Sequence, residues 1–337
     1  MDDDKGGSQE KPETPGDESS KRILLDIAPS AWEHPADKAA LQALRRIPIF
    51  DEVLKKMFGF FGEKPVRLAF QADAVSVSNK QFPEVYRLYK EALRTLDAPH
   101  EYPLFMSPTP IVNPAAYGIN KPFIILNSGT RLLLTDEELQ YVIAHEIAHI
   151  MSDHVLYKTM TVLLINLANM GFPIVGVAAR AVLVGLLEWS RKSELSCDRA
   201  GLLAMQDPEV VMSAMLKMAG GPTPQDRTDL NEFIVQADEY RESGDVADQV
   251  FKVLNVLGRT HPFHVLRVAE LRDWIESGDY DRIVSGEYAR RGEPDSVYEE
   301  DLRAAATAYA DEARDLLDSI TGAAMQAGSD FLSGFRK

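Results

Sequence analysis

Two histidines separated by three residues, His145 and His149, flank Glu146 in a segment whose pattern is helical. Residues four apart lie one turn apart on the same helix face, so both imidazoles can reach one metal ion. Glu146 lies beside the first histidine, where its carboxylate can reach a water on that metal. With seven histidines in 337 residues, this five-residue pattern arises by chance in about one chain in a hundred. The pattern therefore predicts a metal-binding helix.

The start of this helix is also encoded in the sequence. Thr135 and Glu138 have the spacing of a capping box, in which each side chain bonds the other residue's backbone N–H. Apolar residues then recur at helical spacing, and these are Leu139, Val142, Ile143, Ile147, Ile150 and Met151. We therefore expect one amphipathic helix that runs from the cap through the histidine pair.

A third ligand has to come from another part of the chain, because a catalytic zinc site normally has three protein ligands. The metzincin class is excluded, because Val155 stands where its third histidine would be. A later helical segment offers Glu194, followed one turn on by Asp198. Glu194 can bind the metal, and Asp198 can accept the outer N–H of a ligating imidazole.

Three motifs, taken together and in this order, resemble one family of metallopeptidases. The first is the His145–His149 motif followed by His154. The second is Ser190-Arg191 followed by Glu194 and Asp198, and the third is Thr260-His261-Pro262 followed by Arg267. The set resembles the gluzincin family of the CAAX prenyl endopeptidases, the HtpX-type heat-shock proteases and the Oma-type mitochondrial proteases. The likeness extends over residues 103–271, about half of the chain.

This resemblance implies a zinc metalloendopeptidase with one zinc ion per chain. It implies that His145, His149 and Glu194 hold the zinc, with Asp198 supporting them from behind. It also implies that Glu146 acts as the general base that activates water for attack on a peptide bond.

The same resemblance implies further residues that face the substrate. A histidine and an arginine of the third motif face the active site, which corresponds to His261 and Arg267, and they would stabilise an oxyanion. The family has an Asn-Ala pair before its edge strand, for which Asn113 is the nearest match, although Pro114 follows it. A polypeptide substrate would bind as an extended strand along the strand formed by Phe123, Ile124, Ile125, Leu126 and Asn127.

The order of elements predicts an α+β, mainly helical fold. Residues 66–70, 74–78, 104–106 and 123–126 have the pattern of short strands. Helical patterns occupy residues 36–62, 82–96, 207–218, 230–240, 246–257, 263–274 and 296–317, and no strand is expected after Thr130. We therefore expect a zincin-like metallopeptidase with a small antiparallel sheet and an active-site helix.

Three segments divide the chain. Residues 1–22 form an acidic tail without an apolar run, and we expect this tail to be disordered. Residues 23–290 would form the metallopeptidase domain, and residues 291–337 a helical extension. Within the domain, the apolar stretch 160–187 is interrupted by Gly171 and Pro173, so each half is too short to cross a bilayer. Both a buried helical hairpin and a hairpin that touches a membrane stay open.

Composition limits the partners and the compartment. Lys and Arg number 36 against 52 Asp and Glu, a formal net charge of −16. Nucleic acid is excluded as the main partner, because binding a phosphate backbone requires clustered basic side chains. The single cysteine, Cys197, excludes an intramolecular disulfide and indicates a reducing compartment. We therefore expect a cytoplasmic protein, either free or peripheral to a membrane.

Three functions are compatible with these residues. The first is a zinc endopeptidase, with a role in protein quality control. The second is a chaperone-like or membrane-associated binding module that keeps zinc for structure and does not cleave peptides. Glu146 argues against this module, because a structural zinc site needs no general base. The third is a zinc hydrolase of other substrates, which no residue favours. The sequence does not predict cleavage specificity or oligomeric state.

Overall fold

The computed structural model describes residues 21–45, 50, 63–169, 176–221, 228–242 and 263–293. The expected tail 1–22 lies outside the described residues except for residues 21–22, and the expected extension 291–337 except for residues 291–293. The helices expected at 246–257 and 296–317 also lie outside them.

Helices form most of the described chain. In chain order they are η1 (Pro29–Ala31), α1 (Pro35–Arg45), α3 (Glu63–Gln71), α4 (Pro83–Thr95), α5 (Ser128–Leu133), α6 (Asp136–Met151), α7 (Val155–Asn169), α8 (Gly176–Met205), α9 (Pro208–Gly220), α10 (Leu230–Glu242), α12 (His264–Glu276) and α13 (Asp279–Ser285). The strands among the described residues are β1 (Val75–Ser76), β2 (Leu104–Ser107), β3 (Ala115–Tyr117) and β4 (Phe123–Asn127).

The strands form one small sheet in the order β1-β2-β4-β3. β1 pairs with β2 and β3 pairs with β4 in antiparallel fashion, whereas β2 and β4 are parallel, with Leu104 opposite Ile124. The expected α+β, mainly helical fold is confirmed, but the sheet is mixed rather than antiparallel. After β2 the chain first forms β3 at the far edge, and β4 then fills the place between them.

The strand expected at residues 66–70 is wrong, because these residues lie in the helix α3. A short, mostly apolar run does not distinguish a strand from a helix. Glu63 and Pro65 in the first turn favour the helix. Leu68 is 58% exposed, so the apolar side chains of this run do not all lie in the core.

The helix α6 lies at the centre of the fold. Glu138 donates its backbone N–H to the Thr135 hydroxyl (3.3 Å), and its carboxylate accepts the Thr135 N–H (2.8 Å), so the capping box is confirmed. Every residue from Glu138 to Ile150 is buried. The helix contacts α4, α8, α9 and β3, so it is enclosed on all sides instead of presenting one polar face to water.

The long helix α8 crosses α6 at close range. A Cβ atom at Gly201 would lie only 2.7 Å from the ring of Tyr141, so this glycine permits the approach. Ala144 and Ala148 on α6 are fully buried, and their small side chains also allow the two helices to lie close together. Because of this packing, the acidic residues of α8 face the histidines of α6.

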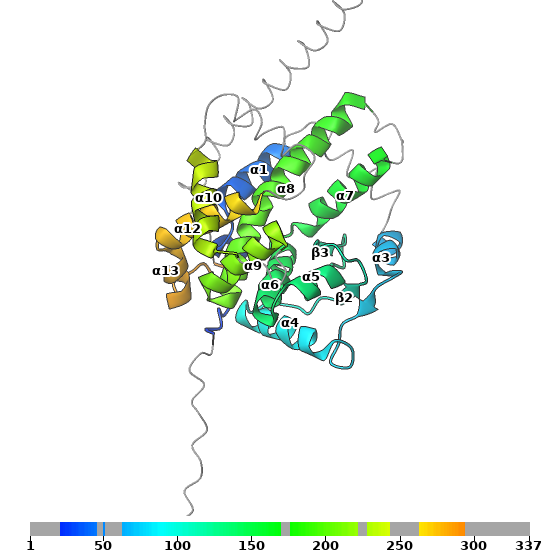
Figure 1. Ribbon diagram of the computed structural model, residues 1–337. Helices are drawn as coiled ribbons and strands as arrows, with labels where there is room; N and C mark the ends of the chain where they lie inside the picture. The colour runs from blue at the N-terminus through cyan, green and yellow to red at the C-terminus, as the bar shows by residue number, and fades with distance from the viewer. Residues whose placement is uncertain are drawn as a thin grey trace, which may run out of the picture.

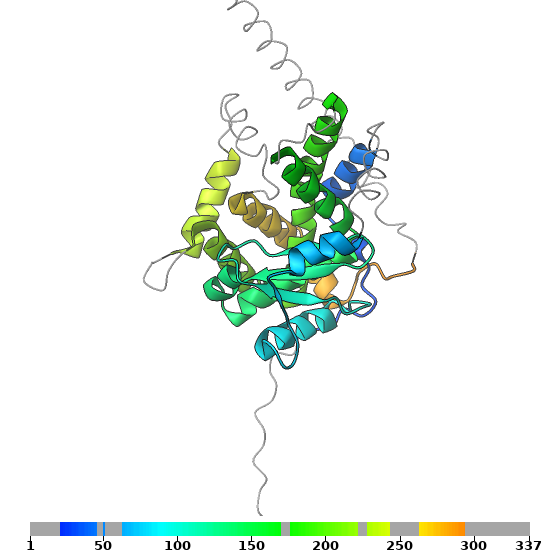
Figure 2. The ribbon, with the colours of Figure 1, turned by 90° about the vertical axis from the view of Figure 1, so that its right-hand side faces the viewer.

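The apolar stretch 160–187 contributes to α7 and to the first half of α8. These helices pack against each other and against α1 around a second core, whose members include Leu44, Met160, Leu164, Leu186 and Trp189. In both views α7 and the first half of α8 extend away from the sheet and from α4 (Figures 1 and 2). Within the described part of the chain, no helix has the length and apolar character needed to cross a membrane.

Candidate metal centre

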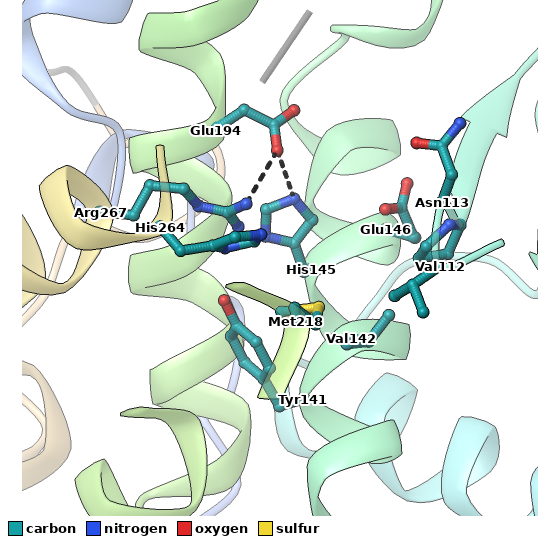
Figure 3. A pocket seen from close by; sticks show the side chains of 11 residues that line it. Val112, Asn113, Tyr141, Val142, His145, Glu146, Glu194, Met218, His264 and Arg267 are labelled. Carbon is teal, nitrogen blue, oxygen red and sulfur yellow. Dashed lines mark ion pairs between the residues drawn. The ribbon is translucent and has the colours of Figure 1, made fainter. Parts of the chain in front are cut away.

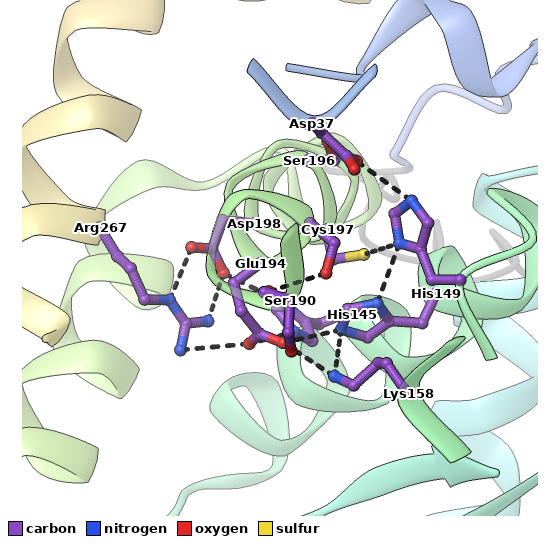
Figure 4. Close-up of polar contacts among 12 residues, drawn as sticks. Asp37, His145, His149, Lys158, Ser190, Glu194, Ser196, Cys197, Asp198 and Arg267 are labelled. Atoms are coloured by element: carbon purple, nitrogen blue, oxygen red, sulfur yellow. Dashed lines mark hydrogen bonds and ion pairs between the residues drawn. The ribbon is translucent and has the colours of Figure 1, made fainter. Parts of the chain in front are cut away.

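Three side chains from two helices converge where α6 and α8 cross. His145 and His149 lie one turn apart on α6, and Glu194 reaches them from α8 (Figure 4). Nε2 of His145 lies 3.3 Å from Oε2 of Glu194, and Nε2 of His149 lies 3.2 Å from Oε1 of Glu194. All three side chains are buried. The structure thus brings together the three residues expected as metal ligands.

Asp198 lies one helical turn after Glu194 and on the outer side of His145. Its Oδ1 lies 3.0 Å from Nδ1 of His145. Arg267 of α12 donates to this carboxylate through both Nε, at 2.7 Å from Oδ2, and Nη2, and Tyr141 donates its hydroxyl to Oδ1 at 2.7 Å. Asp198 is thus fixed in place while it contacts the imidazole.

The carboxylates make this centre attractive to positive charge. Burial alone would raise the pKa of Asp198, but the Arg267 guanidinium, together with hydrogen bonds from Arg267 and His145, lowers it to about 2. Burial alone would lower the pKa of His145, but Asp198 and Glu194 raise it to about 9. A metal cation bound at His145 would compete with this proton.

Glu146 lines a cavity of about 170 Å³ next to the histidines (Figure 3). Its Oε2 is buried and has no hydrogen-bond partner among the described residues. Burial raises the pKa of its carboxyl, although the charges of Lys158 and His145 act in the opposite direction. A buried carboxylate oxygen without a partner, beside two imidazoles, indicates a reacting or binding group.

The segment before β3 forms one wall of this cavity, and it includes Asn113. The expected substrate strand does not have a free edge, because Phe123–Asn127 lies between β2 and β3 and is paired on both sides. The expectation that Phe123, Ile124, Ile125, Leu126 and Asn127 bind substrate along an edge is therefore wrong. β3, which contacts α6, is the edge strand on this side of the sheet.

The third motif is only partly described, because His261 lies outside the described residues. Arg267 lines the cavity, but its guanidinium is bound to Asp198, and its Nη1 lies 3.7 Å from Oε2 of Glu194. His264, at the start of α12, also lines the cavity, and sequence reasoning missed it. Its position one helical turn before Arg267 was the feature of the sequence that could have identified it.

Lys158 is another residue that sequence reasoning missed. Its Nζ lies 2.9 Å from Nε2 of His149 and donates to Oε1 of Glu194 at 2.8 Å. The side chain is 6% exposed. A lysine in the otherwise apolar first turns of α7 was the sequence signal, because lysine is rarely buried without a partner.

These residues fit a bound divalent transition metal. Two imidazole nitrogens and one carboxylate form the ligand set of many catalytic zinc sites, which leave a further position open. The ligand atoms of His145, Glu146 and His149 lie within 4.8 Å of one another. Glu146 and His145 line the same cavity, so a metal held by His145, His149 and Glu194 would lie next to the Glu146 carboxylate.

Comparisons with known proteins agree with this centre. Residues 79–275 match the model of peptidase family M48. The chain is 34% identical over 267 residues to the plastoglobule-localized metallopeptidase 48, chloroplastic, of Arabidopsis thaliana, an alignment that covers 78% of this chain and 77% of that protein. No solved structure gave a significant match.

Proposed function

Because this chain belongs to peptidase family M48 and is therefore a metallopeptidase, we propose that it is a zinc endopeptidase with Glu146 as its general base. The buried and unpartnered Oε2 of Glu146 supports this proposal most directly. A site that held a metal only for structure would not require an acidic group beside its ligands.

The proposed ligands are His145, His149 and Glu194, with one zinc ion per chain. Zinc is favoured over other metals because two imidazoles and a carboxylate are a common catalytic zinc set. When bound, zinc supplies Lewis acidity, which makes water easier to deprotonate and a peptide carbonyl easier to attack. Oδ1 of Asp198 lies 3.0 Å from Nδ1 of His145, where it would accept the outer N–H of the ring and so keep Nε2 for the metal.

Glu146 would move the proton in this reaction. Its carboxylate takes the proton from the attacking water and later gives it to the nitrogen of the leaving amine. Burial raises the pKa of Glu146, which brings its basicity closer to the value that suits proton transfer at neutral pH. The Ala116 N–H bonds this carboxylate and helps to hold it at the cavity.

The attacked carbonyl develops an oxyanion that needs a donor in the cavity. Arg267 is engaged by Asp198, so we assign this role to His264, which lines the cavity beside it. His261, which the family resemblance suggested, stays a second candidate outside the described residues.

The substrate would be an unfolded polypeptide that binds as an extended strand at the edge of β3. This edge lies next to α6, and the cavity beside it has apolar walls that include Val112, Val142 and Met218. Main-chain pairing gives binding with little sequence preference. Binding that depends little on sequence suits the removal of misfolded proteins, so we infer a role in protein quality control.

The Glu146→Gln variant tests the proposal. We expect it to keep about one zinc per chain by elemental analysis and to lose cleavage of casein, because an amide cannot accept the proton. Glu137→Gln changes an exposed carboxylate on the same helix and should leave cleavage unchanged. Cleavage by Glu146→Gln at the wild-type rate would refute the general base. Wild-type protein with zinc but without cleavage of any unfolded protein would favour the chaperone-like module.

The location is inferred from the sequence. The single cysteine, Cys197, favours a cytoplasmic protein, with membrane contact through residues 160–187 as the alternative. Fractionation of cells that express the full chain would separate the two, because membrane contact would place the protein in the membrane pellet at low salt.

A further inference from the structure

A second histidine lies behind the proposed ligand His149. Asp153, in a left-handed conformation with φ 56°, turns the chain at the end of α6, and His154 follows it. Nδ1 of His154 lies 3.1 Å from Nδ1 of His149, and Nε2 of His154 lies 3.1 Å from Oδ2 of Asp37 on α1. All three residues are at most 2% exposed.

Only one arrangement of protons satisfies these contacts when Nε2 of His149 binds a metal. Nδ1 of His149 then carries a proton and donates it to the lone pair on Nδ1 of His154. The proton of His154 is therefore on Nε2, and it is donated to Asp37. Each ring nitrogen then has a defined role in the chain of contacts.

Other hydrogen bonds hold Asp37 in place to accept the proton of His154. Trp189 donates its indole N–H to Oδ1 at 2.9 Å, and Ser196 donates its hydroxyl to Oδ2 at 2.6 Å. Burial alone would raise the pKa of Asp37, but its interactions with His154, Ser196 and Trp189 hold the pKa below its usual value. The hydrogen bonds that begin at His149 and pass through His154 therefore end at a buried carboxylate.

We propose that His154 and Asp37 form a relay that sets the ring orientation and tautomer of His149 and strengthens its bond to the metal. The inference rests on the proposed function, because it takes His149 as a ligand. Each proposed histidine ligand then has a carboxylate behind it. Asp198 contacts His145 directly, and Asp37 reaches His149 through the imidazole of His154. His154 and Asp37 are positioning residues.

The relay makes α1 a part of the metal centre. Asp37 lies outside residues 79–275, which match the family model. The segment before α1 is attached to α8 as well, because the His34 backbone N–H donates to the Ser196 hydroxyl at 2.9 Å. Loss of this N-terminal segment would therefore weaken metal binding as well as packing.

A second metal ion is the alternative use of the same atoms. His149, His154 and Cys197 offer ligand atoms within 4.8 Å of one another, and Sγ of Cys197 lies 3.7 Å from Nδ1 of His154. A metal there would require Nδ1 of His149 to lose its proton while Nε2 binds the first ion. The hydrogen-bonded relay needs no such step, so we favour the relay.

The test measures zinc affinity in the full chain by competition with a zinc chelator. We expect Asp37→Asn and His154→Leu to bind Zn²⁺ about 10- to 100-fold more weakly than wild type, the usual effect of losing an outer partner. Glu270→Gln is the matched control. It removes the negative charge that lies 3.4 Å from Nε2 of His34, next to α1, but leaves the relay intact, and its affinity should equal that of wild type.

A measurement on wild-type protein covers the case in which a variant does not fold. In the zinc-loaded protein labelled with ¹⁵N histidine, we expect the proton on Nδ1 of His149 and a coupling across the hydrogen bond to His154. Wild-type affinity in both relay variants, an equal loss in the control, a proton on Nδ1 of His154, or two zinc ions per chain would each overturn the relay. A wild-type protein that binds no zinc would refute the proposed function as well.

Discussion

Nζ of Lys158 lies 2.8 Å from Oε1 of Glu194, and it also lies 2.9 Å from Nε2 of His149. Both atoms belong to the proposed metal ligands. Burial disfavours the ammonium charge, but the carboxylates of Glu194 and Glu146 outweigh this effect and raise the pKa of Lys158. A cation that binds Glu194 and His149 must therefore displace a charged ammonium group from both of them.

We predict that Lys158→Met binds Zn²⁺ more tightly than wild type, by about tenfold, which corresponds to about 1.4 kcal/mol. The same change leaves buried carboxylates without a cation in the zinc-free protein, so chelator-treated Lys158→Met should melt at a lower temperature than chelator-treated wild type. Chelator competition and thermal unfolding measure the two effects. Weaker zinc binding would show that Lys158 supports the metal instead of competing with it.

The pH profile of kcat/KM should have an acidic limb governed by Glu146. Burial raises the pKa of this carboxyl above its usual 4.5. A general base works only when deprotonated, so activity should fall as pH decreases through this raised value, above the range of an ordinary glutamate. Cleavage of a fluorogenic peptide between pH 4 and pH 8 measures the limb. A profile without any decrease above the ordinary glutamate pKa would contradict the prediction.

Asp198 and Arg267 should be energetically coupled. Both residues are buried, so removal of either one leaves the other as an unpaired buried charge. Each single change should cost about 3–5 kcal/mol of unfolding free energy. The double variant Asp198→Asn/Arg267→Met should lose less than the sum of the single variants in urea unfolding. Arg272→Met is the control, because the contact of Arg272 with Asp238 is partly exposed, and it should cost no more than about 1 kcal/mol.

The pair of Asp198 and Arg267 should also make the free energy of unfolding depend on pH in the acidic range. The pKa of Asp198 is lowered from 3.8 to about 2 in the folded protein. A lowered pKa contributes stability that is present above the unfolded value and is lost as pH falls through the folded value. The contribution of Asp198 should therefore disappear between about pH 4 and pH 2. Urea unfolding at several pH values measures this decrease, which should be shallower in Asp198→Asn.

His264 should affect the chemical step more than zinc binding. If it donates to the developing oxyanion, His264→Leu should reduce kcat by about 100-fold, the usual effect of losing one such donor. Zinc content should stay at the wild-type value, because His264 is not a proposed ligand. An unchanged kcat would exclude His264 from the reaction and would direct attention to His261.

The centre could be predicted from the sequence where local geometry determines it. The spacing of His145 and His149, and that of Glu194 and Asp198, follows directly from helical periodicity. The capping box of α6 is also local, and it is confirmed. The family resemblance of the three motifs is confirmed by the match to peptidase family M48.

The remaining features depend on contacts between distant segments. Asp37 reaches His154 only because α1 packs on α8, and no spacing in the sequence shows this contact. β3 was missed because two of its three residues are alanines, which lack strand preference. The expected substrate strand was misplaced because strand order, unlike strand existence, is decided by the whole sheet.

The central claim is tested most directly by zinc content and casein cleavage, measured together on wild type and on Glu194→Gln. We predict about one zinc per wild-type chain and cleavage that a chelator abolishes and added Zn²⁺ restores, with both zinc and cleavage lost in Glu194→Gln. Cleavage by Glu194→Gln without bound zinc, or chelator-resistant cleavage by wild type, would contradict the account.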